Sequence, residues 1–388
     1  MPEGEESARI FTLDLIRGVA VMGILAMNIV GFALPESAYS NPLSYGIYGP
    51  ADRWSWLLGF LLVDGKMRGL FSFLFGASML LIIQRADAAG QPSERVHFAR
   101  MLWLLVFGLV HFYLIWWGDI LSLYAVIGMF ASFYVYQPSA TLLRWGVLLV
   151  LAQALVELTA GQPPASDPIT ISSSLNLYRS GFAHIAAHRL GDDLLYPLAN
   201  IGTYGWETLG YMLFGMAALK TGFLSGEWPR RRYKQIALFG FGIGLPIYAL
   251  LAVEQISSGF SPDSIRYWNF AATTLVRPPT ILAYAALIIL LGSGRGVLAR
   301  RIAAAGRAAF TNYLGTSLIM TFLFYGWGLG RFGTLGRAQL WLVVLPMWAL
   351  MLLWSKPWLE RFRYGPFEWL WRSMARGEPQ PMLRRGAC

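Results

Sequence analysis

Long apolar runs separated by short polar segments dominate this chain. Each run holds about twenty residues, the length that a helix needs to cross the hydrocarbon core of a bilayer. A shorter apolar stretch at 54–63 either lengthens the second helix or lies re-entrant. The pattern predicts an all-α, polytopic transmembrane helical bundle of about ten spanning helices, within a range of roughly nine to twelve, in one domain covering residues 1–388. The ten runs lie near 12–34, 66–83, 101–117, 119–136, 142–159, 202–220, 235–254, 271–292, 307–328 and 338–354.

The composition supports the same class. Of the 388 residues, 56% are hydrophobic and 13% are charged, whereas roughly 25% are charged in an ordinary soluble domain. The mean hydropathy is +0.49. The single cysteine, Cys388, leaves no pair for an internal disulfide and no thiolate cage for a metal.

Lysine and arginine gather in alternate connections, and this predicts the orientation. With the N-terminus in the cytoplasm, the run at 230–234, the pair at 300–301 and the basic cytoplasmic tail at 355–388 all fall inside, so the positive-inside rule favours N-in and C-in. The net charge of +10 is then mostly a topology signal, and the tail can touch anionic lipid headgroups. Nucleic acid is not an expected partner, because no soluble basic domain is present. The acidic start, MPEGEESAR, is unlike a signal peptide, so the first helix should stay in the mature protein.

The segment 160–201 is the longest polar stretch, and the spacing of apolar residues in its middle is that of a short amphipathic helix. We expect an extracytoplasmic loop with an interfacial helix, and a plain connector is the alternative.

Polar residues interrupt the first apolar run. Asp14, Arg17 and Asn28 lie where a spanning helix should be nearly all hydrocarbon, and buried ionisable groups in membranes usually mark a working site. Arg17 and Asn28 share one helix face about 16 Å apart, and Asp14 lies one turn before Arg17, so that pair can form an ion pair. The alternative is a structural salt bridge together with an Asn that bonds a neighbouring helix.

Placing polar residues by depth predicts an outward-facing pocket. Asp64, Lys66 and Arg68 enter at the outer end of the second span, His111 lies past the middle of the third, and Asp119 opens the fourth. Asn28 reaches the same outer half. We therefore expect these six side chains to converge.

His111 is the candidate general base, because an imidazole titrates near neutral pH. On a continuous helix Asp119 would lie about 12 Å away. A direct bond therefore needs the Gly118–Asp119 turn to fold the chain back, or another partner such as Asp64. A packed histidine with one satisfied nitrogen is the alternative. No second histidine lies at helical spacing nearby, so no metal site is expected.

A different set lies near the inner boundary. Asp14, Arg17, Arg307 and Asn312 are candidate cofactor-binding residues, since arginines there can clamp the phosphate oxygens of a nucleotide-like cofactor. The aromatic and basic run at 358–372 is close by. Such a run is also typical of any interfacial tail.

Several motifs carry a family resemblance. LDLIRGVAVMGILAMNI, LFSFLFG at 70–76, GLVHFYLIWWGDILSLYAVIG at 108–128, GRAAFTNYLGTSLIMTFLFYGWGLGRFG at 306–333 and SKPWLERFRYGPFEWLWRS at 355–373 resemble the YeiB-like family of bacterial membrane proteins, a domain of unknown function. That family is grouped with transmembrane acyltransferases, which share the LD-x-x-RG opening that Asp14, Arg17 and Gly18 match. Related sugar O-acyltransferases place a His late in the first helix, where this chain has Asn28.

The resemblance implies a bacterial cytoplasmic (inner) membrane protein that moves an acyl group from cytoplasmic acyl-CoA to an extracytoplasmic hydroxyl or amine, with a small molecule or glycan as acceptor. His111 would replace the missing base, oriented by Asp119 or Asp64, with Asn28 and Lys66 stabilising the oxyanion. A transporter or exporter that uses the same polar pocket is the alternative from another class. An inert membrane scaffold is a third reading, and a homo-oligomer stays open.

Overall fold

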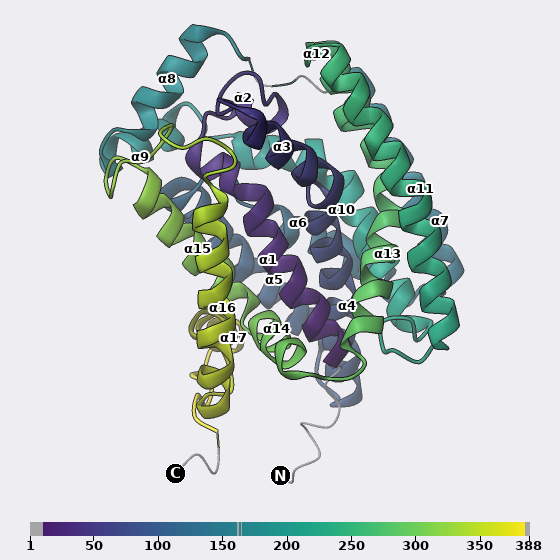
Figure 1. Ribbon diagram of the computed structural model, residues 1–388. Helices are drawn as coiled ribbons and strands as arrows, with labels where there is room; N and C mark the ends of the chain where they lie inside the picture. The colour runs from purple at the N-terminus through teal and green to yellow at the C-terminus, as the bar shows by residue number, and fades with distance from the viewer. Residues whose placement is uncertain (1–10, 161–162, 164, 385–388) are drawn as a thin grey trace.

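The computed structural model describes residues 11–160, 163 and 165–384, and every described element of secondary structure is a helix apart from one isolated bridge between Phe362 and Leu383. The acidic start and Cys388, on which two of the expectations above rest, lie outside the described residues. Figure 1 shows a bundle of long helices in which the described part of the chain begins and ends on the same side.

Seven helical stretches are long and apolar enough to cross a membrane, so the chain is a multi-pass membrane protein. They include α1 (Phe11–Ala33), the pair α3 (Pro50–Leu62) and α4 (Lys66–Ala88), and α5 (Ser93–Val110) continued by the π-helical segment η2 (His111–Ile115). The others are α7 (Ser139–Ala160), α11 (Arg230–Ser257), α13 (Thr273–Gly292) with the π-helical η4 (Ile265–Ala272) and α12 (Pro262–Ser264) before it, and α16 (Trp341–Arg361).

Three of the ten predicted spans form helices that are too short or not apolar enough to cross a membrane by the same measure. α6 (Leu121–Ala131), even with the 3₁₀ turn η3 (Ser132–Tyr134), and α15 (Ala309–Phe324) are short helices. α10 (Tyr196–Lys220) is long but less apolar, and it carries Glu207. These three helices still fill the bundle between the seven, and the stretch at 54–63 forms α3.

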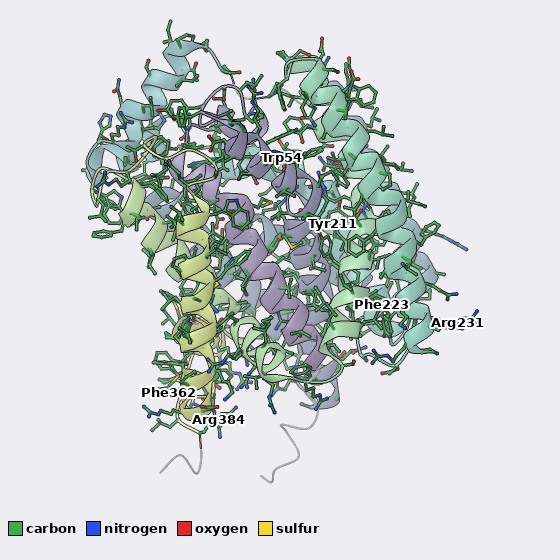
Figure 2. The ribbon with its side chains drawn as sticks, viewed as in Figure 1. Trp54, Tyr211, Phe223, Arg231, Phe362 and Arg384 are labelled. Carbon is green, nitrogen blue, oxygen red and sulfur yellow. The ribbon has the colours of Figure 1, made fainter. Side chains whose placement is uncertain are left out.

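Short helices cover both ends of the bundle. α2 (Ser37–Ser40), α8 (Pro168–Tyr178) and α9 (Phe182–Gly191) lie at the end away from the termini, so the segment 160–201 holds two helices where one was expected. At the other end, α14 (Val297–Arg307) crosses under α1, and α17 (Pro366–Arg376) folds the tail back against α5 and α15. Figure 2 shows Arg231, Phe362 and Arg384 toward the end with the termini and Trp54 toward the opposite end.

Glycines let two helix pairs approach backbone to backbone. A Cβ atom on Gly18 of α1 would lie 2.0 Å from the Ile302 carbonyl oxygen of α14, and one on Gly306 of α14 would lie 1.9 Å from the Asp14 oxygen. α4 and α10 meet in the same way at Gly76 and Gly215. Small residues at helix crossings are what packing in a membrane requires, because close van der Waals contact replaces the hydrophobic effect there.

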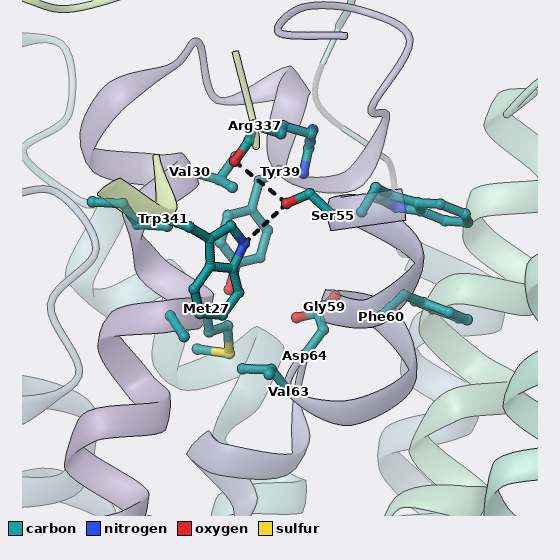
Figure 3. A pocket seen from close by; sticks show the side chains of 13 residues that line it. Met27, Val30, Tyr39, Ser55, Gly59, Phe60, Val63, Asp64, Arg337 and Trp341 are labelled. Carbon is teal, nitrogen blue, oxygen red and sulfur yellow. Dashed lines mark hydrogen bonds between the residues drawn. The ribbon is translucent and has the colours of Figure 1, made fainter. Parts of the chain in front are cut away.

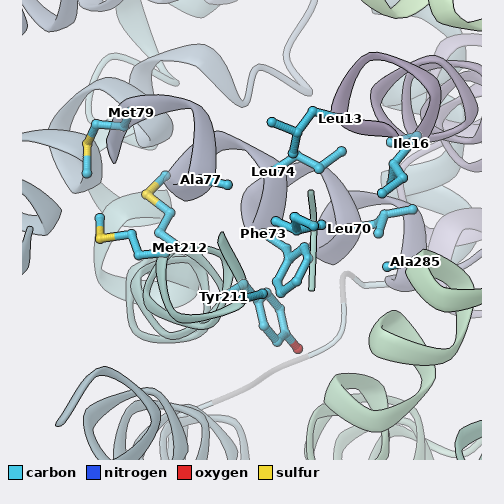
Figure 4. Packing of buried hydrophobic residues seen from close by; sticks show 14 of the residues in the cluster. Leu13, Ile16, Leu70, Phe73, Leu74, Ala77, Met79, Tyr211, Met212 and Ala285 are labelled. Carbon is cyan, nitrogen blue, oxygen red and sulfur yellow. The ribbon is translucent and has the colours of Figure 1, made fainter. Parts of the chain in front are cut away.

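The main apolar core forms where α1, α4 and α10 meet. Figure 4 shows Leu13 of α1 above Leu74 of α4, with Phe73 of α4 against Tyr211 of α10. This core holds the inner half of α1, and therefore the Asp14–Arg17–Gly18 turn, at a fixed depth in the bundle.

Candidate functional site

His111 and Asp119 form a buried pair through a reversal of the chain. α5 ends as η2 at Ile115, the backbone turns, and α6 begins at Leu121 and runs back. His111 Nδ1 and Asp119 Oδ1 are 2.9 Å apart, and both side chains are buried. The turn at Gly118–Asp119 thus brings together two residues that a continuous helix would hold about 12 Å apart.

Asp119 is held in place by the start of α6. Its carboxylate accepts hydrogen bonds from the backbone N–H of Leu121 at 3.1 Å and of Ser122 at 2.8 Å, and from the Ser122 hydroxyl at 2.7 Å. A carboxylate that satisfies the first N–H groups of a helix is also stabilised by the helix dipole. These hydrogen bonds hold the Asp119 carboxylate where it fixes the orientation of His111.

The second ring nitrogen of His111 has no hydrogen-bond partner among the described residues, although the side chain is completely buried. Because Nδ1–H donates to Asp119, the neutral ring carries its lone pair on Nε2. The rings of Trp116 and Tyr313 flank the imidazole, with centroids 6.2 Å and 5.2 Å away. A buried imidazole oriented by a carboxylate with a free Nε2 is the arrangement that a general base needs.

A cavity of about 190 Å³ runs from the end of the bundle where α1 begins toward this pair. Along α4 its wall extends from Ile82 to Phe71, eleven residues, which is a rise of about 16 Å. Its far end is formed by Ile120, by Leu121 and Tyr124 of α6 and by Tyr313 of α15. Tyr313 is thus both a wall of the cavity and a neighbour of His111.

Four arginines from four helices line the inner part of the cavity: Arg17 of α1, Arg100 of α5, Arg307 of α14 and Arg372 of α17. Arg17 bonds Asp14 Oδ1 at 3.0 Å and the Ser78 hydroxyl at 2.5 Å. Glu368 is the one acidic side chain in the described lining. The cavity therefore has a positive mouth.

Glu368 is itself engaged by the protein. It accepts the backbone N–H of Phe310 at 2.7 Å and of Thr311 at 3.1 Å at the start of α15. Burial raises the pKa of this carboxyl from its ordinary value, although the hydrogen bonds from Thr311 act in the opposite sense. Both carboxylate oxygens of Glu368 are thus engaged by hydrogen bonds at the start of α15.

Two of these arginines were not among the residues predicted from sequence. The guanidinium of Arg100 lies over the ring of Trp371, 4.3 Å from its centroid, and the Trp371 indole donates to the Arg100 carbonyl at 2.9 Å. Arg372 stacks on Tyr364 at 4.5 Å. Arg100 looked like an ordinary loop charge, and Arg372 like part of an interfacial tail. In the sequence, the only indication of a binding surface here was the alternation of aromatic residues with arginine at 358–372.

Of the other predicted inner residues, Asp14 pairs with Arg17 as its spacing allowed, whereas Asn312 lies outside the cavity lining. The Asn312 amide donates to the Ala305 carbonyl at 3.0 Å and the Ser355 hydroxyl at 3.2 Å, and accepts from the Trp354 indole at 2.8 Å. It joins α14, α15 and α16 beside Arg307.

The residues predicted to form one outer pocket lie in separate parts of the structure. Lys66 donates to the carbonyls of Phe60 at 2.7 Å and Asp64 at 3.2 Å, and its ammonium lies 3.4 Å from the ring centroid of Tyr248. Asp64 lines a second cavity of about 60 Å³ near the outer end, which does not adjoin the larger one. Asn28 is buried on α1, on the face that carries Arg17.

The outer cavity has charged groups on opposite walls. Figure 3 shows Asp64 below and Arg337 above, with the Trp341 indole donating to Ser55 at 3.0 Å and Ser55 donating to the Arg337 carbonyl at 3.3 Å. Tyr39 closes the back.

A buried ionic cluster that the sequence analysis missed joins three helices. Glu207 of α10 accepts from Arg68 of α4 and from Arg277 of α13, with Arg277 Nη1 2.6 Å from Oε2, and Tyr211 adds a hydrogen bond at 3.2 Å. Glu207 is fully buried. The signal was available, because Glu207 is the one acidic residue in the apolar run at 202–220. Every carboxylate oxygen is paired, so the cluster holds helices together.

Among the described residues, no group of three or more His, Cys, Asp or Glu side chains is arranged to hold a metal ion.

Comparison with known proteins finds relatives of this chain in bacteria. A family model described as "Protein of unknown function (DUF418)" matches residues 218–378. "Uncharacterized protein YeiB" from Escherichia coli (strain K12) is 33% identical over 387 residues, covering 96% of this chain and 98% of the relative. "Uncharacterized protein YxaH" from Bacillus subtilis (strain 168) is 31% identical over 403 residues, covering 97% and 96%. None of these names states an activity.

Proposed function

The chain belongs to the DUF418 family, together with YeiB and YxaH, and on that premise we propose that it is a transmembrane acyltransferase of the bacterial cytoplasmic (inner) membrane. It would take an acyl group from cytoplasmic acyl-CoA and pass it to a hydroxyl or amine on the outer side. One observation carries this proposal: an arginine-lined cavity leads from the inner end of the bundle to an oriented, buried histidine.

The orientation rests on charge. α1 begins at the end of the bundle that holds the arginine mouth, and Arg231 and Arg384 lie toward that end as well (Figure 2). The positive-inside rule assigns that end to the cytoplasm, which gives N-in and C-in. An acyl-CoA made in the cytoplasm would then meet the open end of the cavity, and the basic tail would meet anionic lipid headgroups.

The mouth suits a phosphate-bearing ligand. Guanidinium groups bind phosphate oxygens with paired, charge-assisted hydrogen bonds, and Arg17 and Arg307 stand on either side of the α1–α14 crossing. Beyond them the walls are apolar, with Phe71, Phe75 and Phe310. The phosphate groups of acyl-CoA would bind at the arginine mouth, and its thioester arm would lie between the apolar walls.

The chemistry would use His111 as the base. Nε2 takes the proton of the acceptor O–H or N–H, the acceptor oxygen or nitrogen attacks the thioester carbonyl carbon, and the C–S bond breaks as the tetrahedral intermediate collapses. The proton held on His111 then goes to the departing CoA thiolate. Asp119 stabilises the imidazolium between the two transfers.

Two further residues complete the path. Tyr313 separates the cavity from His111, and its hydroxyl donates a long hydrogen bond of 3.4 Å to the Gly118 carbonyl. Rotation of Tyr313 would join the thioester to Nε2. Asn28, on the Arg17 face of α1, is the proposed donor to the oxyanion. Lys66 and Asp64 bond or face other groups near the outer end, so the proposed mechanism does not use them.

The test uses purified full-length protein with CoA and acetyl-CoA. We expect both to bind, with affinity that falls as salt rises, because the mouth is positive. We also expect slow release of free CoA thiol from acetyl-CoA, with water in place of the acceptor. His111→Ala should abolish release and keep CoA binding, and His184→Ala, at an exposed histidine, should change neither. Unchanged thiol release in His111→Ala, or no binding of either compound, would refute the proposal.

An exporter is the second candidate, and the outer cavity with Asp64 facing Arg337 favours it (Figure 3). A transporter needs polar sites that are reached from both sides, and this chain has cavities toward both ends of the bundle. Binding of a solute that Asp64→Asn abolishes, with no binding of CoA, would decide for transport.

A further inference from the structure

The larger cavity is closed at the end next to the His111–Asp119 pair. Ile120, Leu121 and Tyr124 form this end, and Leu121 and Tyr124 are almost fully buried. Only the Tyr313 side leads on toward His111. A chain that enters from the arginine mouth therefore meets a wall where its reacting end must stop.

The wall is fixed by hydrogen bonds and by backbone packing. Tyr124 shares a hydrogen bond of 2.8 Å with the Ser72 hydroxyl and donates to the Arg68 carbonyl at 3.2 Å. The Leu121 N–H is held by Asp119. Behind them, a Cβ atom on Gly108 of α5 would lie 2.3 Å from the Ser122 nitrogen, so α5 and α6 are already in backbone contact. The end cannot widen without moving α6.

The volume of the larger cavity limits how many ligand atoms fit inside it. A cavity of roughly 150 Å³ holds one benzene molecule, that is, six carbon atoms. By that measure the cavity of about 190 Å³ holds about seven or eight non-hydrogen atoms. The thioester arm that runs from the arginine mouth to the closed end takes up most of this volume, so little of it is left for the acyl chain.

We propose that this closed end restricts the acyl group to short chains such as acetyl and propionyl, with Leu121 as the residue that sets the limit. This inference rests on the proposed function and specifies its donor. Longer chains would have to displace α6 from α5, and with it the Asp119 that orients His111.

The experiment compares acyl-CoA compounds of increasing chain length on the full-length protein by calorimetry. We expect acetyl- and propionyl-CoA to bind at least as tightly as CoA, and hexanoyl-CoA about tenfold or more weakly. Leu121→Ala removes three carbon atoms from the wall and should restore hexanoyl-CoA binding. Leu123→Ala is the matched control, since Leu123 is buried on the same helix but lies outside the cavity lining.

The outcomes separate this inference from the proposed function. Equal binding of all chain lengths by the natural protein, or no gain in hexanoyl-CoA binding by Leu121→Ala, would overturn the chain-length limit and leave acyl-CoA binding intact. If neither CoA nor acetyl-CoA binds, the proposed function fails and the limit fails with it. Leu121→Val, a smaller change, replaces Leu121→Ala if that variant does not fold, with butyryl-CoA as its probe.

Discussion

The crossing of α1 and α14 gives the sharpest prediction, because it controls both the fold and the arginine mouth. In Gly18→Ala the new Cβ atom would lie 2.0 Å from the Ile302 oxygen, and ordinary contact begins near 3.4 Å, so the two helices must separate by about 3.4 − 2.0 = 1.4 Å. Overpacking of this kind costs about 1–3 kcal/mol. Arg17 directly precedes Gly18 on α1, and Arg307 directly follows Gly306 on α14. The two arginines therefore move apart with their helices.

We therefore expect Gly18→Ala to lower the thermal midpoint of the purified protein and to weaken CoA binding about tenfold, equivalent to about 1.4 kcal/mol. Thermal unfolding and calorimetric titration with CoA measure the two effects. The matched control is Gly242→Ala on α11, where a Cβ atom would meet nothing within 4 Å. Alanine there removes the helix penalty of glycine, so stability should stay the same or rise. If Gly18→Ala melts at the same temperature as Gly242→Ala, the close crossing is wrong.

Three further predictions concern other polar contacts. Glu207→Gln removes the charge shared by two buried arginines and should cost about 3–5 kcal/mol, measured as a lower midpoint of unfolding. Glu368 has a pKa raised above 4.5 in the folded state, so its carboxyl binds more protons folded than unfolded, and its contribution to stability falls as pH rises through that window. Glu368→Gln should remove this fall, so its stability relative to the natural protein should grow with pH in denaturation at successive pH values. Asn312→Ala should lower stability by about 1–3 kcal/mol through the lost amide hydrogen bonds, while CoA affinity stays within about twofold.

Each of these has its own contradicting result. Glu254→Gln, at an exposed position on α11, is the control for Glu207→Gln. Similar midpoints for the two variants would mean that the cluster does not hold the bundle. A constant stability difference across pH would show that Glu368 is not perturbed. If Asn312→Ala weakens CoA binding as much as Arg307→Gln, then Asn312 belongs to the mouth after all.

Much of the fold follows from short-range pattern. Apolar runs of membrane length fix the class, and the placement of lysine and arginine favours one orientation. The Asp14–Arg17 pair was readable because three residues on a helix bring two side chains together. The count of spans did not follow from the pattern, since α6 and α15 are short helices whose first N–H groups are satisfied by Asp119 and Glu368.

The candidate site needed the tertiary structure. Sequence spacing identified His111 and Asp119 but left open whether the turn would close the gap. It grouped Asp64 and Lys66 with them by depth, although depth says nothing about which side of a helix faces which neighbour. Arg100 and Arg372 come to the mouth only because α17 folds back against α5.

The sequence by itself determined that this is a multi-pass membrane protein with charged groups buried in its helices, because hydrocarbon length and the 3.6-residue helical repeat are local properties. Only the tertiary structure decided which of those charges share a cavity, since contacts between helices depend on packing partners that lie far apart in the chain. Gly18 and Gly306 illustrate this: each is an ordinary glycine in the sequence, and their crossing sets where Arg17 and Arg307 stand.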